Sequence, residues 1–189
     1  MADPYVYPGS TVLKNKLDIR DAEQLAAIER AITTAKFLSP PPALDVTADG
    51  YRSLHRYIFE DVYDWAGDYR SVNIAKGNSF FCAPQFIAKQ MNERFDVIRA
   101  DDRILSRDSG TFAESLAEHV SELNAIHPFR EGNGRTLQIW LQQMADAAGV
   151  PFELTRVPPQ GWINASITSF AVGDTKPFET IILRAIGKG

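Results

Sequence analysis

The chain has 189 residues, 44% of them hydrophobic and 23% charged, with a formal net charge of -4 and an isoelectric point near 5.4. These values favour one globular domain with a substantial core and argue against a general basic surface for nucleic acid. Cys82 is the single cysteine, which excludes an intrachain disulfide and a cysteine-based metal cluster. The first residues lack signal-peptide character, and no apolar run approaches the roughly 20 residues that span a bilayer. We therefore expect a cytoplasmic protein that contacts neither a membrane nor nucleic acid directly.

The first 46 residues are predicted to form an irregular arm followed by a helix. Turn-forming residues, including Pro8 and Gly9, recur between positions 4 and 16. The helix is indicated by apolar residues at steps of three and four, from Leu25 to Ala35. The prolines at positions 40–42 end it, because proline disfavours helix at the preceding residue and donates no backbone hydrogen bond.

The same apolar spacing predicts six more helices after residue 46. The first of them follows Thr47, a good N-cap, and is expected to stop at Gly67. The third helix of the chain begins near Pro84, a residue tolerated in a first turn. The apolar positions that define the six helices are Leu54, Ile58, Val62 and Trp65; Ile87, Met91, Phe95 and Ile98; Phe112, Leu116, Val120 and Leu123; Leu137, Leu141, Met144 and Ala148; Ile163, Ile167 and Phe170; and Phe178, Ile182 and Ala185.

Residues 70–82 differ from this helical pattern. Val72 and Ile74 precede a polar run at positions 75–79, and Phe80 and Phe81 follow it, which predicts a β-hairpin with a polar tip. Because an isolated hairpin is marginal in water, we interpret it as a flap that covers part of the molecule. The sequence therefore predicts an all-α domain with one β-hairpin.

The most informative segment is the loop His127-Pro128-Phe129-Arg130-Glu131-Gly132-Asn133-Gly134-Arg135. Pro128 should end the preceding helix near Ile126, and the next helix should begin around Asn133. The loop then faces a helix N-terminus, where unpaired N–H groups and the helix dipole favour an anion. Phe129 is expected to anchor the loop to the core.

The side chains of this loop suit phosphate chemistry on a hydroxyl group. Gly132 and Gly134 permit the backbone angles of a phosphate-binding nest, and Arg135 supplies a fixed cation. Glu131 is a carboxylate that, beside a polyphosphate, suits Mg²⁺. His127 has the ordinary pKa range of a general base.

A lone histidine is more often structural than catalytic. We assign His55 and His119 to that class because each lies beside an apolar helix face. The combination of a base, an acid, glycines and an arginine in one loop favours function for His127, since folding does not require all of these residue types together.

The loop resembles the signature of the Fic domain, HPFx[D/E]GNGRxxR. The resemblance extends from about Thr47 to the C-terminus and includes residues 72–77, which are similar to the family's target-docking flap. It implies a single Fic domain over residues 1–189. Its parts would be an arm and first helix at 1–46, a core at 47–189, a flap at about 70–82 and an active-site loop at 127–135.

The resemblance implies transfer of AMP from ATP to a hydroxyl side chain of a target protein. His127 would be the general base, and Glu131 would hold Mg²⁺. The anion hole would consist of Gly132, Asn133 and Gly134, with Arg135 on the β-phosphate and the flap residues Lys76 and Gly77 near the nucleotide. For the two flap residues, a solvated turn is an equally good interpretation.

One position departs from the signature, since Gln138 stands where the family has its final arginine. In Fic proteins that arginine binds the γ-phosphate and pairs with an inhibitory glutamate. An amide loses the charge-assisted hydrogen bond, which is typically worth roughly 1.5–3 kcal/mol. Gln138 therefore leaves open a different transferred group, such as another nucleotide or phosphocholine, or a kinase-like orientation of the nucleotide.

Autoinhibited Fic proteins carry the motif [S/T]xxxE[G/N]. The nearest match here runs from Thr175 to Glu179, contains Pro177 and lacks the final Gly or Asn, so we interpret it as a helix start. The chain then resembles toxins that a separate antitoxin protein inhibits, with the first helix and arm as candidate contacts. The non-enzymatic alternative is a catalytically silent interaction module that keeps the loop only as a nucleotide or partner site. The presence of both His127 and Glu131 argues against it.

Overall fold

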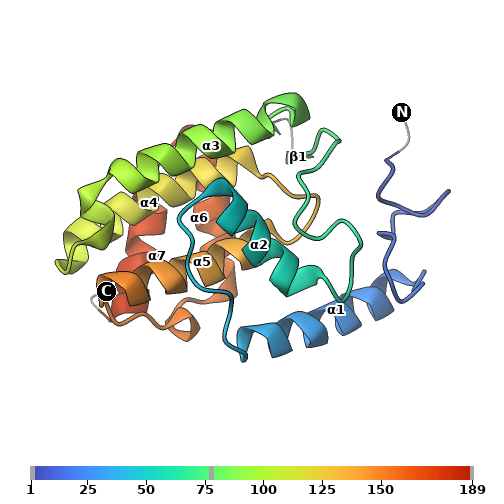
Figure 1. Ribbon diagram of the computed structural model, residues 1–189, viewed down its shortest axis with the longest axis horizontal. Coiled ribbons are helices and arrows are strands. Elements are labelled where there is room, and N and C mark those ends of the chain that lie inside the picture. The colour runs from blue at the N-terminus through green and yellow to red at the C-terminus, as the bar shows by residue number, and fades with distance from the viewer. Residues whose placement is uncertain (1–2, 77–78, 188–189) are drawn as a thin grey trace.

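The computed structural model describes residues 3–76 and 79–187, which fold into seven α-helices, two 3₁₀ helices and one pair of short strands (Figure 1). The α-helices are α1 (Ala22–Phe37), α2 (Ala48–Phe59), α3 (Pro84–Ala100), α4 (Ser109–Ile126), α5 (Asn133–Ala148), α6 (Pro159–Val172) and α7 (Lys176–Ile186). The 3₁₀ helices are η1 (Asp102–Leu105) and η2 (Leu154–Arg156). The predicted all-helical architecture is confirmed, and no described helix is long and apolar enough to cross a bilayer.

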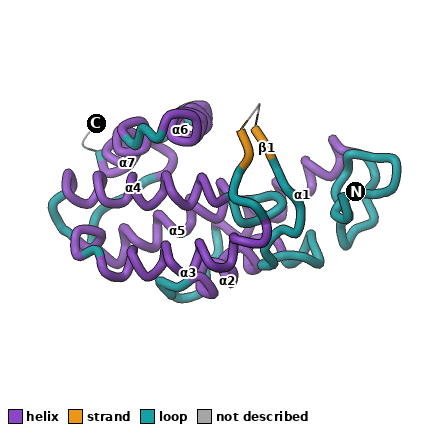
Figure 2. The backbone as a smooth tube through the Cα atoms, turned by 90° about the horizontal axis from the view of Figure 1, so that it is seen from above, coloured by secondary structure: helices purple, strands orange, loops and turns teal. Residues whose placement is uncertain are grey.

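Helix α4 is the centre of the molecule, because it packs against α3, α5, α6 and α7. Figure 2 shows it between α6 and α7 on one side and α3 and α5 on the other. An apolar stripe at helical spacing runs along α4 and includes Phe112, Leu116 and Val120, which are fully buried. The loop at 127–132 follows the C-terminal end of this central helix.

An aromatic cluster anchors that loop to the core, as predicted for Phe129. Phe129 is fully buried and stacks on Tyr51 of α2, with ring centroids 5.8 Å apart. Tyr51 also contacts Phe95 of α3 and Trp140 of α5. Aromatic side chains of α2, α3 and α5 therefore hold the loop against the core.

Helix α2 begins as predicted, because the Thr47 side chain accepts a hydrogen bond from the Gly50 N–H at 2.9 Å. The prediction that it continues to Gly67 is wrong, since α2 ends at Phe59. The chain then makes consecutive turns that bury Val62, and Gly67 adopts a positive φ of 86°. Those turns return Gly67 to α2, where its N–H donates to a side chain of that helix.

The hairpin is shorter than predicted. Strand β1 (Ala75–Lys76) pairs antiparallel with β2 (Ser79–Phe80), in the register Ala75 with Phe80. Val72, Ile74 and Phe81 lie outside the strands, although the Phe81 N–H donates to the Ile74 carbonyl at 3.2 Å. Two-residue strands project from the helical body (Figure 2), and Gly77 at the predicted tip lies outside the described residues.

The N-terminal arm packs on the domain. Its backbone folds back on itself at the bridge between Val6 and Leu13. Asp3 forms an ion pair with Arg130 at 2.8 Å, and the Tyr5 hydroxyl accepts a hydrogen bond from the Ser71 N–H at 3.0 Å. The arm thus contacts both the loop at 127–132 and the segment that leads to β1.

Candidate active site

His127 lies at the C-terminus of α4, which ends at Ile126 as predicted. The backbone of His127 is left-handed, with φ 50° and ψ 63°, a conformation that turns the chain away from the helix axis. Its Nδ1 lies 3.2 Å from the carbonyl oxygen of Asn124, and its ring stacks on Phe81 with centroids 4.1 Å apart. Because a carbonyl only accepts, Nδ1 carries the proton in this contact, and Nε2 is the basic nitrogen of the neutral ring.

A cavity of about 340 Å³ opens beside His127. It is lined by the loop, by the first turn of α5 and by apolar and aromatic side chains from α2, α4, α6 and the end of the hairpin. The lining residues are Tyr51, Phe81, Leu123, Asn124, His127, Glu131, Asn133, Gly134, Leu137, Trp162, Ile163, Ser166 and Phe170. The structure therefore brings His127 and Glu131 to one cavity at the N-terminus of a 16-residue helix.

Glu131 is exposed and lines the cavity, directly before the first turn of α5. Its Oε1 accepts a hydrogen bond from the Gly132 N–H at 2.9 Å and lies 3.4 Å from Nη2 of Arg135. A carboxylate thus occupies the position beside the α5 N-terminus where an anion is favoured.

Of the two loop glycines, only Gly132 has the predicted positive φ. Its φ is 82°, and a Cβ there would lie 2.3 Å from the Phe59 ring. Gly134 is part of α5 with helical angles, and its Cβ would meet nothing closer than Trp162 Nε1 at 3.8 Å. Gly134 therefore does not use the nest angles that a glycine permits, and it instead keeps the cavity wall free of a side chain.

The Asn133 side chain stabilises the loop. Its Oδ1 accepts from the Phe129 N–H at 2.9 Å, and its Nδ2 donates to the Phe129 carbonyl at 2.8 Å. This reciprocal pair holds the buried loop residue to the first turn of α5.

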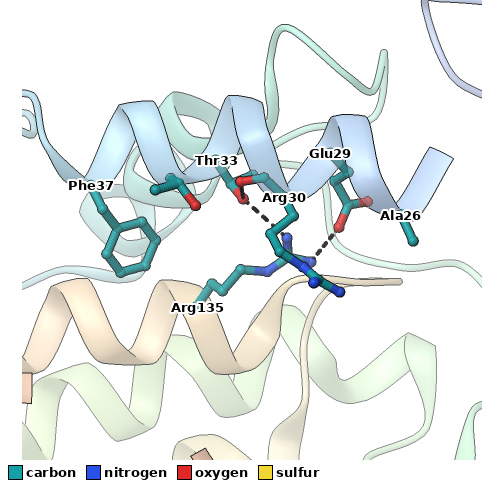
Figure 3. Close-up of a pocket in the computed structure, with 7 residues that line it drawn as sticks. Ala26, Glu29, Arg30, Thr33, Phe37 and Arg135 are labelled. Carbon is teal, nitrogen blue, oxygen red and sulfur yellow. Dashed lines mark hydrogen bonds and ion pairs between the residues drawn. The ribbon is translucent and has the colours of Figure 1, made fainter. Parts of the chain in front are cut away.

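Arg135 faces α1 (Figure 3). Its Nη2 lies 2.6 Å from Oε1 of Glu29, and its Nη1 donates to Thr33 at 3.3 Å. The guanidinium also lies over the Phe59 ring, 4.6 Å from its centroid, and Glu29 accepts a further hydrogen bond from the Tyr63 hydroxyl. These contacts border a second cavity of about 490 Å³, lined by Ala26, Glu29, Arg30, Thr33, Thr34, Phe37 and Arg135.

Two further predicted site residues, Gln138 and Lys76, do not line the His127 cavity in the described structure. Gln138 is half-buried in α5, and among the described residues neither it nor Arg135 lines that cavity. Lys76 lies in β1, and Gly77 is outside the described residues.

His55 contacts the loop, a role that its sequence position did not reveal. Its Nδ1 accepts from the Gly67 N–H at 2.8 Å, so Nε2–H donates to the Glu131 carbonyl at 3.0 Å. The ring stacks on Phe129, with centroids 3.8 Å apart. Burial lowers the pKa of His55 to about 3, so that the ring is neutral near pH 7.

Asn124 and Ser166 are cavity residues that the sequence analysis also missed. Asn124 lies in the last turn of α4, three residues before His127, and this short separation in sequence could have revealed it. Ser166 belongs to α6, and its carbonyl accepts from Asn124 Nδ2 at 3.0 Å. No spacing rule links two residues that are 42 positions apart.

The donor set fits Mg²⁺ only if a ligand supplies further oxygens. Among the described residues, no three His, Cys, Asp or Glu side chains converge as a metal site. Glu131 is the acidic side chain that lines the His127 cavity. Mg²⁺ is usually held by one or two carboxylates together with phosphate oxygens and water, so Glu131 and a bound polyphosphate would suffice.

The chain is similar to a known protein family and to several named proteins. The Fic/DOC family matches residues 45–145. The chain is 37% identical over 185 residues to "Probable protein adenylyltransferase y4lH" of Sinorhizobium fredii, covering 97% of this chain and 96% of that protein. It is 30% identical over 188 residues to "Probable protein adenylyltransferase Fic" of Escherichia coli, covering 98% and 93%. It is 34% identical to the protein adenylyltransferase VbhT of Bartonella schoenbuchensis, covering 89% of this chain but 36% of VbhT.

Solved structures share the fold. The N-terminal Fic domain of a Bartonella quintana cell filamentation protein with bound ADP has a TM-score of 0.87 at 24% identity, covering 96% of this chain and 93% of that chain. BepC of Bartonella tribocorum with bound AMPPNP has a TM-score of 0.86 at 22% identity, covering 96% and 95%. With the family match over more than half of its length, the chain belongs to the Fic/DOC family.

Proposed function

We propose that this protein transfers AMP from ATP to a hydroxyl side chain of a target protein in the cytoplasm, with Mg²⁺ as cofactor. The observation that carries the proposal is the convergence of His127, Glu131 and the α5 N-terminus on one cavity. The names of the relatives and the nucleotides bound in the two similar structures support it.

The residues divide the reaction between them. Nε2 of His127 accepts the hydroxyl proton while the hydroxyl oxygen attacks the α-phosphorus of ATP. The bond from that phosphorus to the bridging oxygen breaks, and pyrophosphate leaves. The first-turn N–H groups of α5, including those of Asn133 and Gly134, lack helical carbonyl partners and stabilise the phosphate charge. Glu131 would hold Mg²⁺, and the bound ion would neutralise charge on the phosphates.

Arg135 would have to leave Glu29 to reach the β-phosphate, as the family resemblance implies. Gln138 would stand at the far end of the nucleotide, where it can offer a neutral hydrogen bond. The hairpin would dock the target as a flap. Its position supports this role, because Phe81, directly after β2, stacks on the catalytic His127 ring.

We further propose that a separate small antitoxin inhibits the enzyme. The near match to the inhibitory motif is the start of α7. Its Glu179 forms an ion pair with Lys176 of the same helix at 2.7 Å, which does not support an inhibitory role within this chain. Helix α1 and the arm reach the loop through the Glu29–Arg135 and Asp3–Arg130 pairs, which makes them candidate contacts for an antitoxin. Co-expression with a small protein carrying [S/T]xxxE[G/N] should suppress labelling; replacement of its glutamate should restore it.

The main test uses ATP labelled at the α-phosphate, with Mg²⁺ and cell lysate. Label should appear on a protein with the natural chain and with Lys89→Ala, an exposed control on α3, but not with His127→Ala. Absence of any His127-dependent label would refute AMP transfer.

The second candidate, transfer of another phosphate-containing group, rests on Gln138. Mass spectrometry of the modified target separates the two proposals. An added mass equal to that of AMP supports the first, and any other added mass supports the second.

A further inference from the structure

Arg70 is a fully buried cation at the junction between the hairpin and the active-site loop. The residue is 2% exposed, and within residues 3–76 and 79–187 it forms no ion pair with a carboxylate. A buried charge is costly unless hydrogen bonds satisfy it. Burial lowers the pKa of Arg70, although an arginine remains charged near neutral pH.

Backbone carbonyls take the place of the missing carboxylate. The Arg70 guanidinium donates to four of them: His127 at 2.8 Å from Nε, Val72 at 2.7 Å from Nη1, and Cys82 at 2.5 Å and Ile126 at 3.3 Å from Nη2. The backbone N–H of Arg70 donates to the Pro128 carbonyl at 2.9 Å. Five hydrogen bonds thus radiate from one residue to two separate parts of the chain.

Those acceptors belong to the two parts that the proposed reaction needs together. Val72 precedes β1 and Cys82 follows β2, so the guanidinium closes the base of the hairpin. Ile126 and His127 form the end of α4, where the backbone turns left-handed.

We propose that Arg70 is a positioning residue that holds the base of the hairpin and the backbone of His127 in one fixed arrangement. The role rests on the proposed function insofar as His127 is the catalytic base. The planar fork of an arginine directs several N–H groups at fixed angles, which the single ammonium of a lysine does not reproduce. Phe81 precedes Cys82 in the chain, and its ring stacks on the His127 ring. By holding Cys82, Arg70 therefore also fixes the position of the His127 imidazole.

The first test observes the His127 ring without requiring activity. The chain has three histidines, so selective labelling yields three ring signals in an NMR spectrum. In Arg70→Lys, the His127 signal should shift or broaden as its Phe81 stacking changes. The His119 signal should stay in place, because Asp101 holds that ring in a separate cluster at 3.1 Å.

The control for this variant is Arg99→Lys, which removes another arginine fork that donates to a carbonyl, that of Val46, away from the loop. It should leave the His127 signal unchanged. An unchanged His127 signal in a folded Arg70→Lys protein would overturn the proposal, whether or not the protein transfers AMP.

A second measurement uses the natural protein and guards against an Arg70→Lys variant that does not fold. Backbone hydrogen exchange should show one shared opening rate for Arg70, Phe81 and His127, whose N–H groups bond to Pro128, Ile74 and Leu123. Independent opening of the hairpin base and the loop would contradict a common unit.

Kinetics then separate positioning from general stability. With AMP-transfer activity established, Arg70→Lys should lower kcat roughly tenfold to a hundredfold, because a misplacement of about 1 Å costs up to about 100-fold. The KM for ATP should change less than about threefold, since the α5 N-terminus is left intact. A loss confined to KM would refute the role at His127.

Discussion

The guanidinium of Arg135 and the carboxylate of Glu29 form an ion pair, with Nη2 and Oε1 2.6 Å apart. Glu29 belongs to α1, and its side chain is mostly buried, so the pair joins the N-terminal helix to the first turn of α5 (Figure 3). The arginine that family resemblance assigns to the nucleotide is therefore held against α1 in this structure. Glu29 and a phosphate group would compete for the same cation.

Replacing Glu29 with Gln is expected to release that competition. ATP with Mg²⁺ should bind more tightly by about tenfold, since a hydrogen bond to a charged group is worth about 1.5 kcal/mol at the low end of its range. Isothermal calorimetry measures the change, and Glu23→Gln, in the exposed first turn of α1, is the matched control. Equal affinity for the natural and Glu29→Gln proteins would show that Arg135 does not reach the bound nucleotide.

Gln138→Arg restores the residue that the family signature has at this position. We expect tighter ATP binding by at least about tenfold with little change for AMP, because the added charge would act on the far phosphates. Titration with the two nucleotides checks the difference. An equal gain for both would point to a general electrostatic effect, and no gain would place residue 138 away from the nucleotide.

Gly132→Ala should destabilise the fold by roughly 2 kcal/mol or more, because a left-handed residue is strained and the new Cβ would lie 2.3 Å from Phe59. Gly149→Ala separates the two causes, since its φ is 67° but nothing lies within 4 Å of its Cβ. Gly134→Ala, in helical geometry, should keep or slightly raise stability. Urea unfolding ranks the three variants; a Gly132→Ala loss no larger than that of Gly149→Ala would exclude the Phe59 clash.

His55 should make stability depend on pH in the acidic range. Its pKa is about 3 when folded and near the ordinary 6.5 when unfolded, so the unfolded chain binds the extra proton between those values. The contribution of His55 is therefore complete above about pH 6.5 and declines as the pH falls, by up to about 1.4 kcal/mol per unit.

The measurement compares the natural protein with His55→Gln by urea unfolding at several pH values. Two other groups also have a lowered pKa: His119 because of burial, and Asp101 because of hydrogen bonds, chiefly from Arg103. Both shifts are present in both proteins, so the difference between the two stabilities isolates the effect of His55. The stability advantage of the natural protein should shrink from pH 6 to pH 4. A constant difference would mean that His55 is not held neutral by the fold.

Local signals in the chain were sufficient for most of the helical framework. Thr47 and Pro128 mark helix ends where the structure has them, because caps and breakers act through the backbone within a few residues. Helix α2 shows where such signals fail. Val62 and Trp65 continue its apolar spacing, yet the chain leaves the helix at Phe59 because the turns that follow bury Val62 in the core and return Gly67 to His55.

By itself, the sequence determined the helical class, the C-terminal end of α4, the beginning of α5, and the composition of the loop between them. Those features depend on contacts between near neighbours. Only the tertiary structure decided that Arg135 pairs with Glu29, that His55 bonds to Glu131, and that Arg70 closes the hairpin onto His127. Each of these pairs is separated by more than 50 residues, and which partners meet depends on how the whole core packs.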